Sequence, residues 1–393
     1  MVLASRAFMN TPHRIYLGIY REDDPSGKFE VRIQYADGDT VCFPGASPNT
    51  AYEFKKRVVM LGVRVSAGGY WYLIFENPGH RVDGVLQRLP KGPRGWWHDL
   101  HGIPVNPDRG AGIKIGIIDE ALPMQLGASI IGGIKNLGGA AWSAKDDRPF
   151  TPKDSTEHGF SICSLVGARP LSATDYEGIA PGAEIVFAAA GCEDNEEIDI
   201  LRLEASMLML RDDEECDIIT FSAGDSLSRL PVIREALIGM ADKGVLCFAA
   251  AGNEGGAPRY PARYEECLAV GSVGKVDLAP KNSADVWARG QSIVETAGEL
   301  YHSPDSARGP DVDFLGGGSS VFCADAQNCW ESRSGTSFSA PIVAATAAII
   351  LASDPKYMAL KGNPGRVRYA LEKLQALSSN PFPTCSRLGI PVA

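Results

Sequence analysis

The sequence predicts an α/β protein whose main domain is a doubly wound parallel sheet with helices on both faces, preceded by a small α+β domain. Short, continuously apolar runs alternate with stretches of helical periodicity in the main domain. Strands that are apolar on both sides are typical of a parallel sheet covered by helices on each face. The runs are residues 113–118, 185–190, 218–221, 245–250 and 267–270.

The composition is that of an ordinary globular protein, with 393 residues, 45% hydrophobic and 22% charged. The formal net charge of -10 repels phosphate backbones, and no long cluster of Lys and Arg offsets it, so nucleic acid is not expected as a partner. Residues 1–12 contain no apolar core of a secretory signal, and no stretch of about 20 apolar residues occurs. We therefore expect a cytoplasmic protein without a membrane partner.

The nine cysteines mostly lie singly in apolar runs, as Cys163, Cys247 and Cys267 do, which predicts small buried thiols. Cys323 and Cys329 are the one close pair, and either a loop disulfide or no bond fits their spacing. No neighbouring His or Cys completes a zinc-binding spacing, so neither a metal nor a cofactor is expected.

Residues 1–95 are predicted to form the small α+β domain, and residues 96–393 the main domain. Apolar patterns indicate strands at residues 15–20, 29–35 and 70–75. A helix is expected to begin at Thr50, because Glu53 follows at capping-box spacing and apolar residues recur at helical intervals up to Leu61. The Pro- and Gly-rich segment 89–112 carries Trp96 and Trp97, which predicts a connector packed onto the main domain.

Two candidate catalytic residues lie where strands end and helices begin. Asp119 directly follows the apolar run 113–118, and functional groups gather at the carboxyl ends of parallel strands. His158 precedes a helical pattern at residues 160–167, where the helix N-terminus disfavours a permanent positive charge and leaves the imidazole able to act as a base. Taken singly, each residue is also explained as a helix cap or turn residue.

Residues 334–341, Ser-Gly-Thr-Ser-Phe-Ser-Ala-Pro, open a long helical pattern of small and apolar residues. Small residues around Ser337 let another backbone approach closely, and a helix start directs amide N–H groups toward a developing oxyanion. A plain helix cap is the alternative, but a cap accounts for one hydroxyl and not for the whole octet.

The octet resembles the nucleophile motif of the subtilisin-like serine proteases. Other blocks resemble that family in its order: residues 116–119, 158–159, 178–181, 219–224, 249–253, and 260–262 with 269–271. The likeness extends from about residue 96 to residue 375. It implies a subtilisin-like fold and a serine endopeptidase that acts on peptides or proteins. A specific processing protease is one form of that function.

The resemblance implies a role for each site residue. Ser337 would be the nucleophile, His158 the general base, and Asp119 the carboxylate that orients and stabilises the imidazolium. The Asn253 side-chain amide and the Ser337 N–H would bind the oxyanion. The predicted substrate-binding residues are Ser222, Ala223 and Gly224, which would pair with an extended substrate, and Ala251 and Gly252 on the opposite wall of the P1 pocket.

The segment after Asp119 departs from the family pattern, because Glu120 and Ala121 replace the usual Ser or Thr and Gly. A second carboxylate would resist ionisation of its neighbour, so we expect Glu120 to face away from the triad. Asp225 and the acidic residues at 193, 194, 196 and 197 suggest a preference for basic substrates, with solvated helix-start carboxylates as the alternative.

Two functional alternatives and two interpretations of the N-terminal unit stay open. The scaffold could serve as a catalytically inactive peptide-binding or regulatory module, or the acyl-enzyme could pass to an amine and give a ligase or cyclase. The N-terminal unit is either a removable propeptide that contacts the peptidase domain or a permanent accessory domain.

Overall fold

A computed structural model of the chain describes residues 93–122, 129–139, 157–171, 175–191, 198–222, 229–276, 295–324 and 330–393. It also describes the backbone of eight strands between residues 2 and 86.

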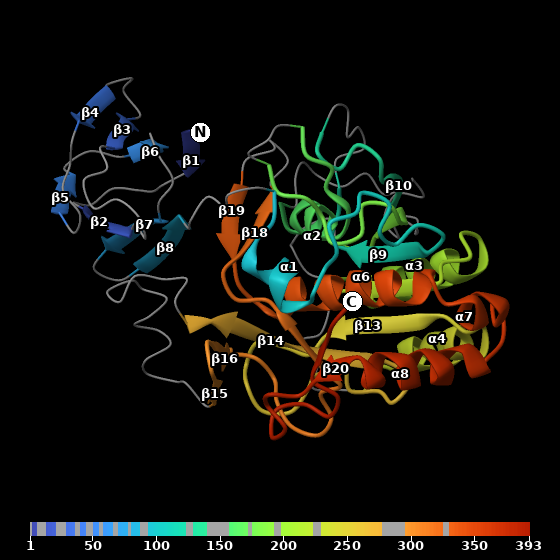
Figure 1. Cartoon of the computed structure of the whole chain (residues 1–393). Helices are drawn as coiled ribbons and strands as arrows, with labels where there is room; N and C mark the ends of the chain where they lie inside the picture. Colours follow the sequence, from blue (N-terminus) through green and yellow to red (C-terminus); the bar gives the residue numbers. More distant parts are fainter. Residues whose placement is uncertain are drawn as a thin grey trace.

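The main domain is built on a nine-stranded, mostly parallel sheet (Figure 1). In spatial order its strands are β10 (Lys135–Gly139), β11 (Glu184–Ala189), β9 (Lys114–Asp119), β12 (Ile218–Phe221), β13 (Leu246–Ala250), β14 (Leu268–Lys275), β16 (Leu300–His302) and β15 (Thr296–Ala297). Neighbours from β10 to β14 are parallel, β16 and β15 continue the sheet antiparallel, and β17 (Phe314–Gly317) pairs in parallel with β14. All five predicted runs are parallel strands of this sheet.

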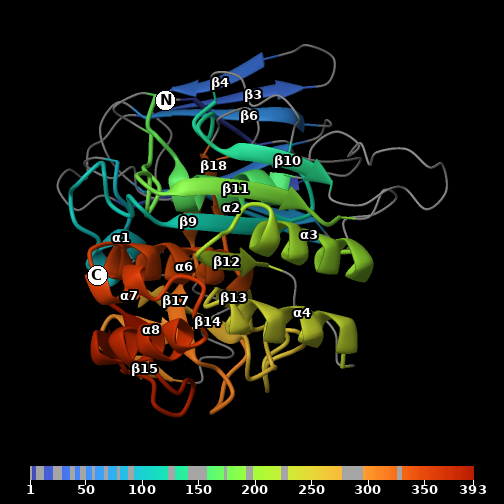
Figure 2. The ribbon, with the colours of Figure 1, turned by 90° about the vertical axis from the view of Figure 1, so that its right-hand side faces the viewer.

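Helices cover both faces of the sheet, as predicted. Figure 2 shows α3 (Ile200–Asp212) and α4 (Pro231–Asp242) on one side, with α6 (Thr336–Ala352) and α8 (Gly365–Ala376) on the other. Side chains from α2 (Glu157–Gly167) and α7 (Pro355–Ala359) belong to the same core as those of α6. The sheet has a hydrophobic core on each face, and successive residues of a strand point into the two cores alternately. Phe248 therefore lies in the core that contains α6 side chains, whereas Cys247 lies in the core that contains those of α3 and α4. The α/β doubly wound fold is therefore confirmed.

The connector packs onto the main domain through α1 (Trp96–Leu100), as predicted. Trp97 is 2% exposed and stacks on Tyr176 with ring centroids 5.3 Å apart. The indole N–H of Trp96 donates a hydrogen bond to the carbonyl of Ser320 over 3.1 Å. The C-terminal residue also contacts this region, since the Ala393 N–H donates to the His101 carbonyl over 2.9 Å.

Two small ribbons complete the main domain. The hairpin of β18 (Val321–Ala324) and β19 (Trp330–Arg333) is antiparallel, and so is the pair of β20 (Ser378–Ser379) and β21 (Ile390–Pro391).

The N-terminal unit contains strands throughout its described residues, arranged as two four-stranded antiparallel sheets. One sheet has the order β1 (Val2–Ser5), β6 (Val58–Val65), β3 (Phe29–Tyr35) and β4 (Thr40–Pro44). The other has the order β5 (Thr50–Phe54), β2 (His13–Tyr20), β7 (Tyr70–Asn77) and β8 (His80–Leu86).

The helix expected from Thr50 is wrong, because that segment forms β5 and the start of β6. Residues 50–54 include Thr50, Tyr52 and Phe54, and residues 58–65 include four valines; β-branched and aromatic side chains favour a pleated strand over a helix. The predicted strands correspond to β2, β3 and β7. The division of the chain at residue 95 stays a prediction.

Within the described residues no helix is both long and apolar enough to cross a bilayer. Cys163, Cys247 and Cys267 are buried thiols as predicted, and burial raises the pKa of each. Cys329 lies outside the described residues, so its pairing with Cys323 stays untested.

Candidate active site

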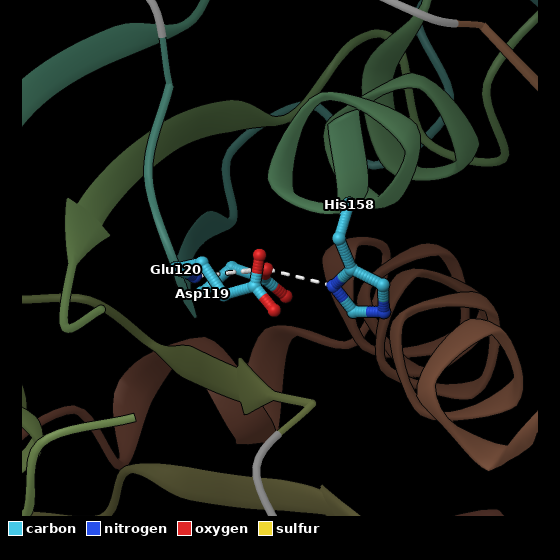
Figure 3. A group of neighbouring side chains, drawn as sticks. All are labelled: Asp119, Glu120 and His158. Atoms are coloured by element: carbon cyan, nitrogen blue, oxygen red, sulfur yellow. Dashed lines mark hydrogen bonds and ion pairs between the residues drawn. The ribbon is translucent and has the colours of Figure 1, made fainter. Parts of the chain in front are cut away.

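Asp119 is the last residue of the central strand β9, which lies between β11 and β12. Its side chain is buried, with 2% exposed. The oxygen Oδ1 accepts a hydrogen bond from the Glu120 N–H over 2.9 Å and lies 2.8 Å from Nδ1 of His158. The carboxylate is therefore held at the carboxyl edge of the sheet with one oxygen directed at an imidazole (Figure 3).

His158 is in the first turn of α2, and its side chain is 24% exposed. Gly159 allows this helix to begin close to the end of β9, since a Cβ there would lie 2.4 Å from the carbonyl oxygen of Ala121. The contact with a carboxylate oxygen assigns the proton to Nδ1, so that Nε2 keeps its lone pair as a base. The structure thus brings together Asp119 and His158, which are 39 residues apart in the sequence.

Five influences act on the pKa of His158. Burial lowers it, but the charge and hydrogen bond of Asp119 and the charge of Glu120 raise it, while Arg333 opposes them. The net result is a pKa above the ordinary histidine value. This balance stabilises a positive imidazolium, as a general base needs once it has taken a proton.

Ser337 is the second residue of α6, directly after Thr336, and Gly335 precedes the helix with φ of 148° and ψ of 161°. That backbone conformation is accessible to glycine and strained for other residues. The carbonyl of Ser337 accepts a hydrogen bond from the Ser222 hydroxyl over 2.9 Å. These contacts hold the backbone that carries the predicted nucleophile.

The imidazole of His158 lies beside this helix start. Its ring centroid is 5.4 Å from that of Phe338, the residue that follows Ser337. Both His158 and Ser337 belong to the described part of the chain, and no hydrogen bond joins the Ser337 hydroxyl to the imidazole there. The imidazole therefore lies next to the residue that follows the predicted nucleophile, without a hydrogen bond to the Ser337 hydroxyl.

The side-chain amide of Asn253 has a fixed orientation. Its Oδ1 accepts hydrogen bonds from the Thr336 N–H over 2.8 Å and from the Thr336 hydroxyl over 3.0 Å. Because a backbone N–H only donates, the atom facing it must be the oxygen, and the Nδ2 group is left to donate elsewhere. The Thr336 hydroxyl in turn accepts from the Gly252 N–H over 3.2 Å. Asn253 is exposed, so a substrate oxygen can reach this donor.

The predicted substrate-binding residues are described only in part. Ser222 follows β12, whereas Ala223 and Gly224 lie outside the described residues, as do Asp225 and the acidic residues near position 195. Ala251 and Gly252 are buried, and the Ala251 N–H and carbonyl are bonded to Val270 and Arg259. Their place in a pocket wall stays a prediction.

Sequence reasoning missed three contacts at the site. Thr336 lies in the motif around Ser337, but its bonds to Asn253 were not expected. Ser222 was expected to act through its backbone, whereas its hydroxyl bonds the Ser337 carbonyl. The expectation that Glu120 faces away is wrong: a carboxylate oxygen of Glu120 lies within 4.8 Å of the nearest Asp119 oxygen and His158 nitrogen. Glu120 follows the end of a strand whose residues alternate sides, but the turn there places both carboxylates beside the imidazole (Figure 3).

Comparison with known sequences gives a consistent result. The model of the subtilase family matches residues 110–377, about two thirds of the chain. Thermitase of Thermoactinomyces vulgaris is 26% identical over 245 residues, covering 61% of this chain and 75% of thermitase. Subtilisin DY of Bacillus licheniformis is 25% identical over 257 residues, covering 63% of this chain and 79% of that protein.

Solved structures show the same fold. A mutant of the protease domain of PatA aligns with a TM-score of 0.55 at 20% identity, covering 73% of this chain and 94% of that chain. The prenylagaramide maturation protease PagA aligns with a TM-score of 0.50 at 21% identity, covering 73% of this chain and 89% of that chain.

Proposed function

Because the chain belongs to the subtilase family, we propose that it is a serine endopeptidase in which Asp119, His158 and Ser337 form the catalytic triad. The observation that carries the proposal is the 2.8 Å contact between Asp119 and His158, made at the sheet edge where Asn253 is also anchored to the nucleophile helix. A buried carboxylate paired with a histidine beside an oriented amide donor is the arrangement that acyl transfer requires.

The first step forms an acyl-enzyme. Nε2 of His158 takes the proton of the Ser337 hydroxyl as the oxygen attacks the peptide carbonyl, and the resulting imidazolium is stabilised by Asp119. The same proton then passes to the leaving amine. The hydroxyl and Nε2 meet through a side-chain rotation of Ser337 when substrate binds, since such contacts commonly tighten only in the complex.

The negative charge on the substrate oxygen is stabilised by two donors at the head of α6. The Asn253 Nδ2 group donates from the side, because its oxygen is already held by Thr336. The Ser337 N–H donates from the first helical turn, where backbone amides have no intrahelical acceptor. Both donors are in place before the reaction, so no reorganisation is needed as charge develops.

Hydrolysis of the acyl-enzyme completes the cycle. Water deprotonated by His158 attacks the ester, and Ser337 regains its proton. An amine in place of water would give a new peptide bond by the same route.

The proposal is tested by incubating the purified full-length chain with a peptide library and weighing the products. We expect paired fragments whose summed mass exceeds that of the substrate by one water, and none with the Ser337→Ala variant. Products formed equally by that variant would contradict the proposal, and new amide-linked products would indicate ligation instead. The pattern of cleaved peptides also separates limited processing from general digestion.

One observation favours a second candidate, a peptide-binding module without catalysis. The Ser337 hydroxyl makes no hydrogen bond to the imidazole in the described structure. If this geometry persists with a bound peptide, the chain would bind peptides without cleaving them. Peptide affinity retained by a protein that releases no product would support this candidate.

A further inference from the structure

Three potential metal ligands converge beside the predicted base. One donor atom each from Asp119, Glu120 and His158 lie within 4.8 Å of one another (Figure 3). Zinc binds carboxylate oxygen and imidazole nitrogen at about 2.0 to 2.2 Å in a tetrahedral arrangement, so two donors of one ion lie about 3.3 to 3.6 Å apart. Binding of an ion would draw the side chain of Glu120, which is only partly buried, toward the other two donors.

A separate observation concerns the second oxygen of the Asp119 carboxylate. Asp119 is 2% exposed, and its Oδ2 atom accepts no hydrogen bond from any described residue. A buried carboxylate oxygen without a donor is unfavourable, and in proteins such oxygens are paired, hydrated or bound to a cation. The oxygen that is not used by the imidazole is therefore available as a ligand.

The local charge and the access also suit a cation. Among the residues that the structure describes, two carboxylates act on the imidazole together with one cationic side chain, that of Arg333 on β19. His158 is 24% exposed on its side chain, so an ion can enter from solvent without unfolding the site.

We propose that Asp119, Glu120 and Nδ1 of His158 form a binding site for a divalent transition metal, with Zn²⁺ as the matching ion. Mixed carboxylate and imidazole sets of this kind are typical of zinc in proteins. The chain spacing gives no hint of the site, because Asp119 and Glu120 are adjacent whereas His158 lies on another element.

Occupation of this site would regulate the activity, and this part of the inference depends on the proposed function. In the structure the Nδ1 proton faces Asp119, and Nε2 keeps the lone pair. When Nδ1 binds the metal, the proton of the neutral ring moves to Nε2, so that no proton is gained or lost overall. A protonated Nε2 cannot accept the proton of Ser337, and hydrolysis stops until the metal leaves.

The site is tested first by direct binding, which needs no catalysis. Full-length Ser337→Ala protein, treated with a chelator and dialysed, is titrated with Zn²⁺ by calorimetry, alone and with Glu120→Gln. The matched control is Glu372→Gln, which removes an exposed carboxylate from α8. We expect the Glu120 variant to lose one site or weaken it about tenfold or more, and the control to bind as the parent does. Equal binding by all three proteins would overturn the proposal.

Nitrogen NMR of histidine-labelled Ser337→Ala protein gives a second readout that needs no Glu120 variant. Zn²⁺ should move the Nδ1 signal of His158 to the metal-bound range and place a proton on Nε2. Unchanged His158 signals at saturating Zn²⁺ would refute the site. In the active chain, Zn²⁺ should inhibit hydrolysis with the affinity measured by calorimetry. Binding without inhibition would refute the regulatory step. A chain that cleaves no peptide even without metal would refute the proposed function instead.

Discussion

Acidification should destabilise the protein through His101, whose ring is completely buried next to α1. Its Nδ1 lies 2.8 Å from the Pro391 carbonyl, and its Nε2 accepts a hydrogen bond from the Gly317 N–H over 3.3 Å. Because the Gly317 N–H only donates, Nε2 carries no proton and Nδ1–H donates to Pro391. A second ring proton would face the Gly317 N–H, so the native structure fits the neutral ring alone.

The size of the effect follows from the pKa of this ring. Burial lowers the pKa of His101 from its ordinary value to about 4, against a smaller opposing effect of the Pro391 hydrogen bond. An unfolded chain with a histidine pKa of about 6.5 binds nearly one proton at about pH 5, whereas the folded chain binds almost none. The stability contributed by the neutral ring is therefore complete above about pH 7 and falls as the pH drops through 6.5 toward 4. Between about pH 7.5 and pH 5 the loss is about 2 kcal/mol.

The prediction is checked by urea unfolding, followed by tryptophan fluorescence, at both pH values in a Ser337→Ala background that prevents autolysis. His101→Gln keeps a donor and an acceptor but no titration, so its stability should fall by about 2 kcal/mol less than that of the parent. The matched control is His158→Asn, since the pKa of His158 is raised and its removal should not reduce the loss. An equal loss of stability in His101→Gln and the parent would refute the reasoning.

Three further predictions concern the oxyanion donor, its anchor and the N-terminal unit. Asn253→Ala should lower kcat by about 100- to 1000-fold with little change in KM, because the donor acts on charge that develops in the transition state; a change confined to KM would contradict this role. Thr336→Val keeps the backbone N–H but loses the hydroxyl bonds to Asn253 and Gly252, so steady-state kinetics should show a kcat about 5- to 10-fold lower. An unchanged kcat would show that Thr336 does not position the oxyanion donor. If the N-terminal unit is removed, mass spectrometry should place the new terminus before Arg94, because α1 and the buried Trp97 belong to the main domain; a break within residues 94–122 would contradict this boundary.

The parallel sheet was predictable because its strands are apolar on both faces. Residues 218–221 and 245–250 carry mostly apolar side chains on both faces, so neither face is suited to solvent. The structure buries these residues in two cores, one on each side of the sheet. The segment 50–61 was harder, since Thr50 and Glu53 match a helix start as well as they match a strand. In that segment pairing with β2 and β3 outweighs the local capping signal.

The residue types of the site were predictable, but their contacts were not. The motif around Ser337 and the Asp and His at element ends indicate chemistry through position alone. The anchoring of Asn253 by Thr336 depends on a contact between residues 83 apart. The direction of Glu120 depends on the turn after β9, which neither periodicity nor composition specifies.

The central claim is that Ser337 is a nucleophile activated by His158. The most direct test is labelling of the folded chain, freed of any removable N-terminal segment, with a fluorophosphonate, followed by peptide mapping. The account predicts one modified serine, at Ser337, and labelling that is lost in His158→Asn. An unmodified Ser337, or labelling that does not depend on His158, would contradict it.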